Sequence, residues 1–147
     1  MIVNKQKKVR LAKRPLGAFL RKAQRELQIG GSEITVAFVS DAEIARWNQV
    51  YRKKKGPTDV LSFPAVSGAG HRRAGARGRK ASEILGDIAI APETAQRYAR
   101  KNGRSLAREI RVLMLHGVLH LMGYDHESDN GQMNRIEQRL RRRLGIA

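Results

Sequence analysis

Apolar residues recur along the chain with two different periods, which separate strands from helices. From residue 33 to 39 every second residue is apolar (Ile34, Val36 and Phe38), the pattern of a strand with one buried face. Between residues 15 and 27 the apolar positions recur every three or four residues, as on a helix that buries one side. Over the whole chain, the pattern predicts strands within residues 1–9 and over 33–39, 60–63 and 84–91, and helices over 15–27, 40–51, 92–101, 105–122 and 128–144.

Individual residues predict where several of these elements begin. Ser40 is followed three residues later by a glutamate, the pair that often opens a helix, so the strand over 33–39 is expected to pass directly into the helix over 40–51. Ser105 is expected to cap the helix over 105–122, and Ser128 or Asp129 the last helix. Pro92 suits a first helical turn, where a backbone N–H has no partner within the helix.

The helix predicted over 105–122 is apolar nearly all round between residues 110 and 122, which is typical of a buried helix. It nevertheless contains His116 and His120. An imidazole without a partner is costly in apolar surroundings, so these two histidines need one. Metal binding would satisfy both.

The segment over residues 67–81 is rich in Gly and Arg and contains no large apolar residue. This composition predicts a mobile loop between two strands. It could contact phosphates or be a solvated insertion, and we assign it no chemistry. His71 belongs to this segment and is left out of any metal site, because a flexible loop gives an imidazole no fixed geometry.

Size and charge narrow the choice of partner. The 147 residues suffice for one domain, which we expect to span residues 1–147. Lys and Arg number 30 against 13 Asp and Glu, a formal charge of +17. Because the basic residues occur in several runs along the chain, they favour RNA or the ribosome as partner over an uncharged small molecule. A merely solvated basic surface is the alternative explanation.

Other features of the composition exclude several classes of protein. The chain has no cysteine, which excludes disulfides and thiolate metal sites. The start of the chain lacks the apolar stretch of a signal peptide, and no segment approaches the roughly 18 apolar residues of a membrane helix. We therefore expect a soluble, cytoplasmic protein without a membrane partner.

Three of the four histidines lie close together near the end of the chain. His116 and His120 are four residues apart and share one face of the predicted helix. Gly123 can leave the helix in a left-handed conformation, so that the following turn brings His126 back as a third ligand. Three imidazoles around one Zn²⁺ ion leave a fourth position open, as in catalytic zinc sites. A satisfied core or a zinc ion needed only for folding is the alternative, which this spacing makes less attractive.

The residue after the first histidine of this cluster limits the chemistry. The spacing His-x-x-x-His-x-x-Gly-x-x-His is shared with zinc peptidases, which carry a glutamate there as general base. Here that residue is Gly117, which cannot take a proton. A metal ion can still make hydroxide available near neutral pH. The pattern therefore favours a phosphodiester, for which a metal and an arginine can supply most of the catalysis. A substrate or a neighbouring strand could be what needs the missing side chain.

Four motifs together resemble those of the YbeY-type endoribonucleases and occur in that family's order. They are Asn-Gln-Val-Tyr-Arg at residues 48–52, Pro-Thr-Asp-Val-Leu-Ser-Phe-Pro at 57–64, Leu-Gly-Asp-Ile at 85–88, and His-Gly-Val-Leu-His-Leu-Met-Gly-Tyr-Asp-His at 116–126. The resemblance implies an α+β fold, in which helices surround a small mixed β-sheet and the metal cleft is similar to that of zinc peptidases. It also implies one Zn²⁺ ion per chain, held by His116, His120 and His126.

The same resemblance implies the activity. It points to a zinc-dependent endoribonuclease specific for single strands, acting in ribosomal RNA maturation and ribosome quality control. Arg52 stands at the position of a functionally needed arginine, and a guanidinium near the ion could bind a phosphate at two points. Catalytic roles are therefore expected for Arg52, which would also bind substrate, and for His116.

Two other functions stay open at this point. One is a metal-dependent hydrolase of another class, such as a peptidase, using the same cleft. The other is a non-catalytic RNA-binding factor of ribosome assembly whose zinc is structural. Among the remaining polar residues, Asp59 and Ser62 could line the cleft, Asp125 is expected to orient a ligand or cap a turn, and Asp87, inside a strand, is expected to need a histidine or arginine partner.

Overall fold

The computed structural model describes residues 1–65, 83–125 and 128–147, and in these ranges it contains four strands and five helices. They follow the order that the hydrophobic pattern predicts. The strands are β1 (Ile2–Asn4), β2 (Glu33–Phe38), β3 (Val60–Pro64) and β4 (Ile84–Ile90). The helices are α1 (Lys13–Glu26), α2 (Asp41–Arg52), α3 (Pro92–Lys101), α4 (Leu106–Leu121) and α5 (Gln132–Arg143). The Gly/Arg-rich segment predicted over 67–81 lies outside the described residues.

The strands form one mixed sheet in the order β1-β2-β4-β3. β1 pairs parallel to β2, and β2 pairs parallel to β4. β3 pairs antiparallel to β4 and forms one edge of the sheet. The predicted α+β class with a small mixed sheet and surrounding helices is thereby confirmed.

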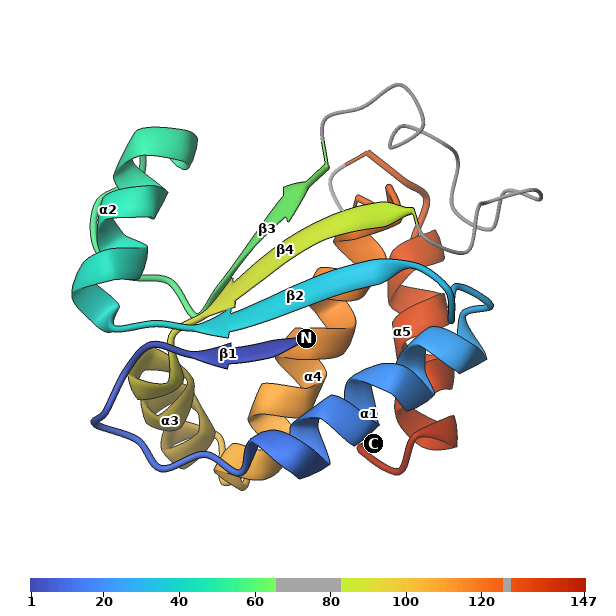
Figure 1. Ribbon diagram of the computed structural model, residues 1–147, viewed down its shortest axis with the longest axis horizontal. Coiled ribbons are helices and arrows are strands. Elements are labelled where there is room, and N and C mark those ends of the chain that lie inside the picture. Colours follow the sequence, from blue (N-terminus) through green and yellow to red (C-terminus); the bar gives the residue numbers. More distant parts are fainter. Residues whose placement is uncertain (66–82, 126–127) are drawn as a thin grey trace.

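The main core lies between one face of the sheet and helix α4. β2 contributes Val36 and Phe38, and α4 contributes Met114 and Leu115, all with no exposed surface. α1 and α5 pack beside α4 (Figure 1). The prediction that the helix containing His116 and His120 is buried is thus confirmed for its apolar residues. In the described part of the chain, no helix is long and apolar enough to cross a membrane.

The opposite face of the sheet is only partly covered. Figure 1 shows α2 on the other side of the sheet from α1 and α4. Ile44 of α2 is fully buried there in a second, smaller cluster with Leu61 of β3 and Ala89 of β4, against which Trp47 packs. The rest of this face carries no helix in the described ranges.

Helices α2 and α4 have the predicted N-cap residues, whereas the last helix begins later than predicted. The Ser40 hydroxyl accepts the Glu43 N–H at 3.2 Å, and the Ser105 hydroxyl accepts the N–H three residues ahead at 3.1 Å. The last helix begins at Gln132, later than predicted, and its first flanking residue is a glycine with φ 85°. The Asp129 side chain still caps this helix. Its carboxylate accepts the backbone N–H of Gly131 at 2.8 Å and of Met133 at 2.9 Å.

Gly117 lies where α4 crosses β4. A Cβ atom added there would lie 2.8 to 3.0 Å from three side-chain carbons of Ile88, closer than real Cβ contacts come. The Ser62 hydroxyl also donates to the Gly117 carbonyl at 3.4 Å, which links β3 to the same point of the helix. The neighbouring strand is therefore what needs the missing side chain, one of the two reasons considered for a glycine at this position.

We expect Gly117→Ala to destabilise the protein by about 1–3 kcal/mol, because the added methyl group overpacks the contact between α4 and Ile88. Urea unfolding followed by circular dichroism would measure the loss. Gly30→Ala is the matched control, since its new Cβ would meet only one atom, at 3.9 Å. In an Ile88→Ala background the cost of Gly117→Ala should shrink; an unchanged cost would contradict the proposed clash.

Candidate active site

His116 and His120 lie on one face of α4, and their rings meet. The two Nε2 atoms are 3.0 Å apart, and the ring centroids are 4.6 Å apart. Two nitrogens that bind one tetrahedral zinc ion at about 2.0–2.1 Å lie about 3.3–3.4 Å from each other. The pair is therefore spaced almost as two ligands of one ion would be. This is the arrangement that the four-residue spacing predicts.

A buried glutamate orients the first of these histidines. His116 Nδ1 lies 2.8 Å from an Oε1 atom of Glu137 on α5, whose side chain is only 6 % exposed. A carboxylate can only accept, so Nδ1 carries the proton, and the lone pair of His116 Nε2 faces His120. The second carboxylate oxygen of Glu137 accepts from Arg141 Nη2 at 2.6 Å. Such a partner fixes the tautomer that a metal ligand needs.

Glu137 is held in its ionised form. Burial favours the neutral acid, but the hydrogen bond from His116, together with the hydrogen bond and charge of Arg141, outweighs it and keeps the pKa of Glu137 below its ordinary value. Sequence reasoning missed this residue. The available signal was a carboxylate on the inward face of the last helix, four residues after Met133 and three before Leu140.

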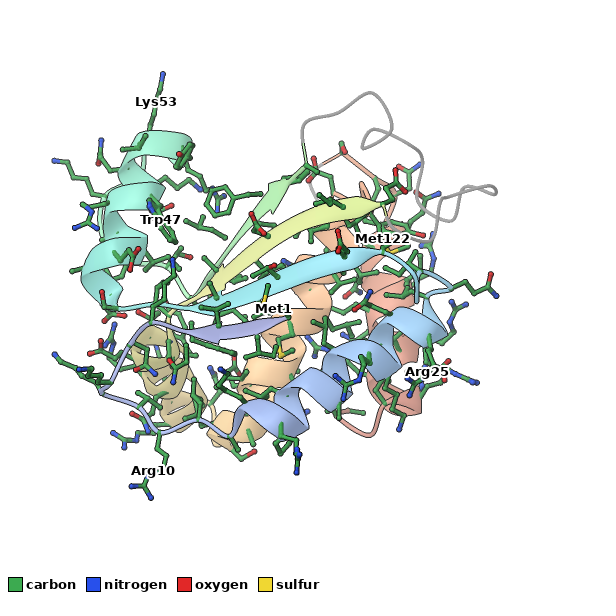
Figure 2. All side chains as sticks on the ribbon, viewed as in Figure 1. Met1, Arg10, Arg25, Trp47, Lys53 and Met122 are labelled. Atoms are coloured by element: carbon green, nitrogen blue, oxygen red, sulfur yellow. The ribbon has the colours of Figure 1, made fainter. Side chains whose placement is uncertain are left out.

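A cleft of about 340 Å³ runs along the edge strand β3 and joins the histidines to Arg52. Arg52 is the last residue of α2, on the other side of β3 from α4. It is exposed and makes no ion pair with a described residue. Its neighbour Lys53 has a left-handed backbone (φ 55°) and projects away from the sheet (Figure 2). The fold therefore brings Arg52 to the histidine pair although His116 lies 64 positions further along the chain.

The structure places the acidic residues Asp59, Asp87 and Asp125 in different surroundings. Asp59 precedes β3 and is not among the residues that line the cleft; burial raises its pKa above the ordinary value, and the nearby Glu109 adds to this effect. Asp87 lies exposed on the open face of the sheet, so the expectation that it needs a buried partner is wrong. The Asp125 carbonyl accepts the N–H groups of Ser128 and Asp129 in the turn before α5.

The third predicted ligand, His126, lies outside the described residues and stays a prediction. Gly123 has the left-handed backbone predicted for it, with φ 101°, directly after α4. Within residues 1–65, 83–125 and 128–147, no group of three or more His, Asp or Glu side chains could hold a metal ion. The described part of the site therefore contains two converging imidazoles, the carboxylate partner of His116 and an arginine across the cleft.

These features define an α+β protein with a histidine cleft along the edge of its sheet. The family model described as Endoribonuclease YbeY matches residues 1–145, and the chain belongs to this family. Proteins named Endoribonuclease YbeY from Koribacter versatilis and Solibacter usitatus are 38 % and 42 % identical to it, over 99 % and 87 % of this chain and 86 % and 76 % of their own lengths. The relative of the same name from Aquifex aeolicus is 36 % identical, over 93 % of this chain and 85 % of its own length.

A solved structure has the same fold. The solution structure of TM1509 from Thermotoga maritima superposes with a TM-score of 0.64 at 26 % identity, covering 98 % of this chain and 89 % of that one. The predicted family and fold class are therefore confirmed. An endoribonuclease hydrolyses internal phosphodiester bonds of RNA, and membership of this family makes the chain an enzyme of that kind.

Proposed function

We propose that this chain is a zinc-dependent endoribonuclease that cleaves single-stranded regions of ribosomal RNA precursors. The observation that carries the proposal is the meeting of His116, His120 and Arg52 in one cleft. Family membership supports RNA as the substrate. The formal charge of +17 supports association with the ribosome, and the cytoplasm is the location in which that association would occur.

The residues present fit a zinc ion. The chain has no cysteine, so its ligands must be nitrogen or oxygen, and imidazole nitrogens suit zinc. His116 and His120 already stand at almost ligand spacing, and Glu137 turns a lone pair of His116 toward the site. We assign the third position to His126. Bound there, Zn²⁺ would supply a Lewis acid beside the phosphate and make hydroxide available near neutral pH.

The protein's own contribution is to bind and hold the RNA. The Arg52 guanidinium, free of ion pairs with described residues, is suited to grip two phosphate oxygens and to stabilise the charge that develops at phosphorus. The hydrogen bond from the Ser62 hydroxyl to the Gly117 carbonyl links the edge strand to α4. It thereby holds in place the wall of the cleft between the arginine and the histidines.

The structure weakens the peptidase alternative further. The base of those enzymes would stand at position 117, where even a methyl group would meet Ile88 at under 3.0 Å. A longer glutamate side chain is therefore excluded without movement of α4 or β4. The non-catalytic alternative leaves unexplained why an exposed arginine and two oriented imidazoles share one open cleft.

Metal analysis and RNA cleavage measured on the same preparation test the proposal. We expect about one zinc ion per chain, loss of cleavage on chelation, and recovery when Zn²⁺ is added back. Substrates would be a ribosomal RNA precursor and matched single-stranded and duplex oligonucleotides. Undiminished cleavage by metal-free protein would contradict the proposal, and casein hydrolysis that depends on His120 would favour the peptidase instead.

Glu137→Gln should weaken zinc binding by about 10- to 100-fold, because the neutral amide holds the His116 ring less strongly than a carboxylate does. Competition with a calibrated chelator would measure the dissociation constant. Glu26→Gln is the matched control. Glu26 on α1 forms an exposed ion pair with Arg143, which lies on α5 as Glu137 does. Equal zinc affinities of both variants and the wild type would remove Glu137 from the site.

A further inference from the structure

The open face of the sheet forms a second groove, of about 380 Å³, beside α2. Its floor consists of small side chains that point away from the main core, among them Thr35 and Ala37 of β2 and Ala89 of β4. Small side chains leave room above the sheet for a planar group. We call this surface the aromatic groove, because one of its walls consists of Trp47, Tyr51 and Phe63.

The three aromatic rings support one another. Phe63 on β3 meets Trp47 edge-to-face at a centroid distance of 6.0 Å and Tyr51 at 5.3 Å. Trp47 lies on α2 above the sheet (Figure 2), and Phe63 is half-buried with it in the smaller core. Tyr51, in contrast, is 66 % exposed. The contact with Phe63 fixes the Tyr51 ring while leaving most of its surface open to a ligand.

The aromatic groove adjoins the active-site cleft. Tyr51 and Phe63 line both, so the two hollows meet at these rings. Tyr51 also lines the active-site cleft together with Arg52, to which we assign the phosphate. A strand with its phosphate at Arg52 would therefore place a neighbouring nucleotide at Tyr51.

The charges of the aromatic groove fit a single-stranded nucleic acid. Lys5 lies exposed at the β1 end, where it can reach a phosphate. Asp87 lies on the floor, where its charge repels phosphates but can accept from the amino group of a base. Aromatic faces flanked by a cation are how proteins bind unpaired bases without strong sequence preference.

We propose that the aromatic groove binds an unpaired base of the RNA strand next to the nucleotide being cleaved. The base stacks on Tyr51 above the floor of the groove, and Lys5 pairs with a phosphate further along the strand. This inference rests on the proposed function, since it takes the strand in the cleft to be RNA. It would explain a preference for single strands, because a base held in a duplex could not turn into the groove.

Binding of two probes, each checked to remain intact during the measurement, tests the stacking. One probe is a short 2′-O-methyl oligouridine, and the other is an abasic oligomer with the same number of phosphates. Tyr51→Ala should raise the dissociation constant of the oligouridine roughly tenfold and leave that of the abasic oligomer unchanged. Tyr51→Phe should bind as the wild type does. Tyr98→Ala, at a partly exposed tyrosine on α3, is the matched control and should change neither constant.

The only tryptophan of the chain gives an independent signal. Trp47 lines the aromatic groove, so the oligouridine should change its fluorescence, whereas the abasic oligomer should not. Lys5→Ala should weaken the binding of both probes and lower the salt dependence of that binding by about one counterion. Lys22→Ala, at an exposed lysine on α1, should have a much smaller effect on both quantities.

Cleavage assays on the same variants separate this inference from the proposed function. If the wild type cleaves RNA but the Tyr51→Ala variant binds the oligouridine as tightly as the wild type does, the inference is overturned and the proposed function stands. Unchanged Trp47 fluorescence would likewise overturn it and would fit a protein partner in the groove. If the wild type cleaves no RNA, the proposed function fails, while the difference between the two probes still decides whether the groove binds a base.

Discussion

His120→Ala is expected to abolish metal binding and to lower RNA cleavage by about 1000-fold or more. The variant removes one of two imidazoles whose Nε2 atoms lie 3.0 Å apart, so the remaining ligands no longer surround an ion. A metal ion supplies several kcal/mol of transition-state stabilisation, and about 4 kcal/mol corresponds to a thousandfold in rate. Metal content per chain and the initial rate of oligonucleotide cleavage would be measured on the same sample.

His120 is a cleaner target than its neighbour. His116 is hydrogen-bonded to the buried carboxylate of Glu137, and its removal would leave that charge without one of its two partners. The resulting loss of stability would be confused with loss of chemistry. The thermal unfolding curve of the His120→Ala protein, compared with that of metal-free wild type, would show whether the fold is kept.

His71→Ala provides the matched control, because this histidine belongs to the Gly/Arg-rich segment and is not a predicted metal ligand. We expect it to keep both metal and cleavage. If His120→Ala bound zinc as well as the wild type, the histidine pair would not be the metal site. If it lost zinc but still cleaved RNA, the ion would have a structural role.

The hydrophobic pattern predicts the elements of this fold well because several of them, such as β2 and α1, bury one face. The alternation in β2 and the helical spacing in α1 are local properties that can be read along the chain. The strand order β1-β2-β4-β3 is not local, since it depends on which strands meet over α4. The late start of α5 is also set by geometry, because the Asp129 carboxylate reaches past a glycine with positive φ to the first helical N–H groups.

The residues of the site likewise differ in whether local sequence spacing predicts them. The spacing of His116 and His120 on one helix suffices to bring them together, so the sequence predicts the pair. Arg52 comes from another helix and could be assigned only through the family motifs. Glu137 acts through a contact between α4 and α5; its spacing places it on the inward face of the last helix but does not reveal His116 as its partner. Asp87 was misjudged because a strand has two faces, and one face of this sheet is partly open.

Arg52→Ala is expected to keep the metal and the fold but to lower kcat for RNA cleavage by about 100- to 1000-fold. Arg52 is exposed and has no ion pair among the described residues, so its removal should cost little stability. Its guanidinium lines the cleft with the histidines and is suited to the charge that develops on the phosphate. Kinetics over a range of RNA concentrations would separate kcat from KM, with metal content as the check on the site.

Lys54→Ala is the control that separates this role from general charge. Lys54 follows two residues later and is equally exposed, but it does not line the cleft. If Arg52 merely adds to the field that attracts RNA, both variants should raise KM alike and leave kcat unchanged, which would contradict the proposed role. Arg52→Lys should recover only part of the rate, because an ammonium group keeps the charge but cannot grip two phosphate oxygens in the planar geometry of a guanidinium.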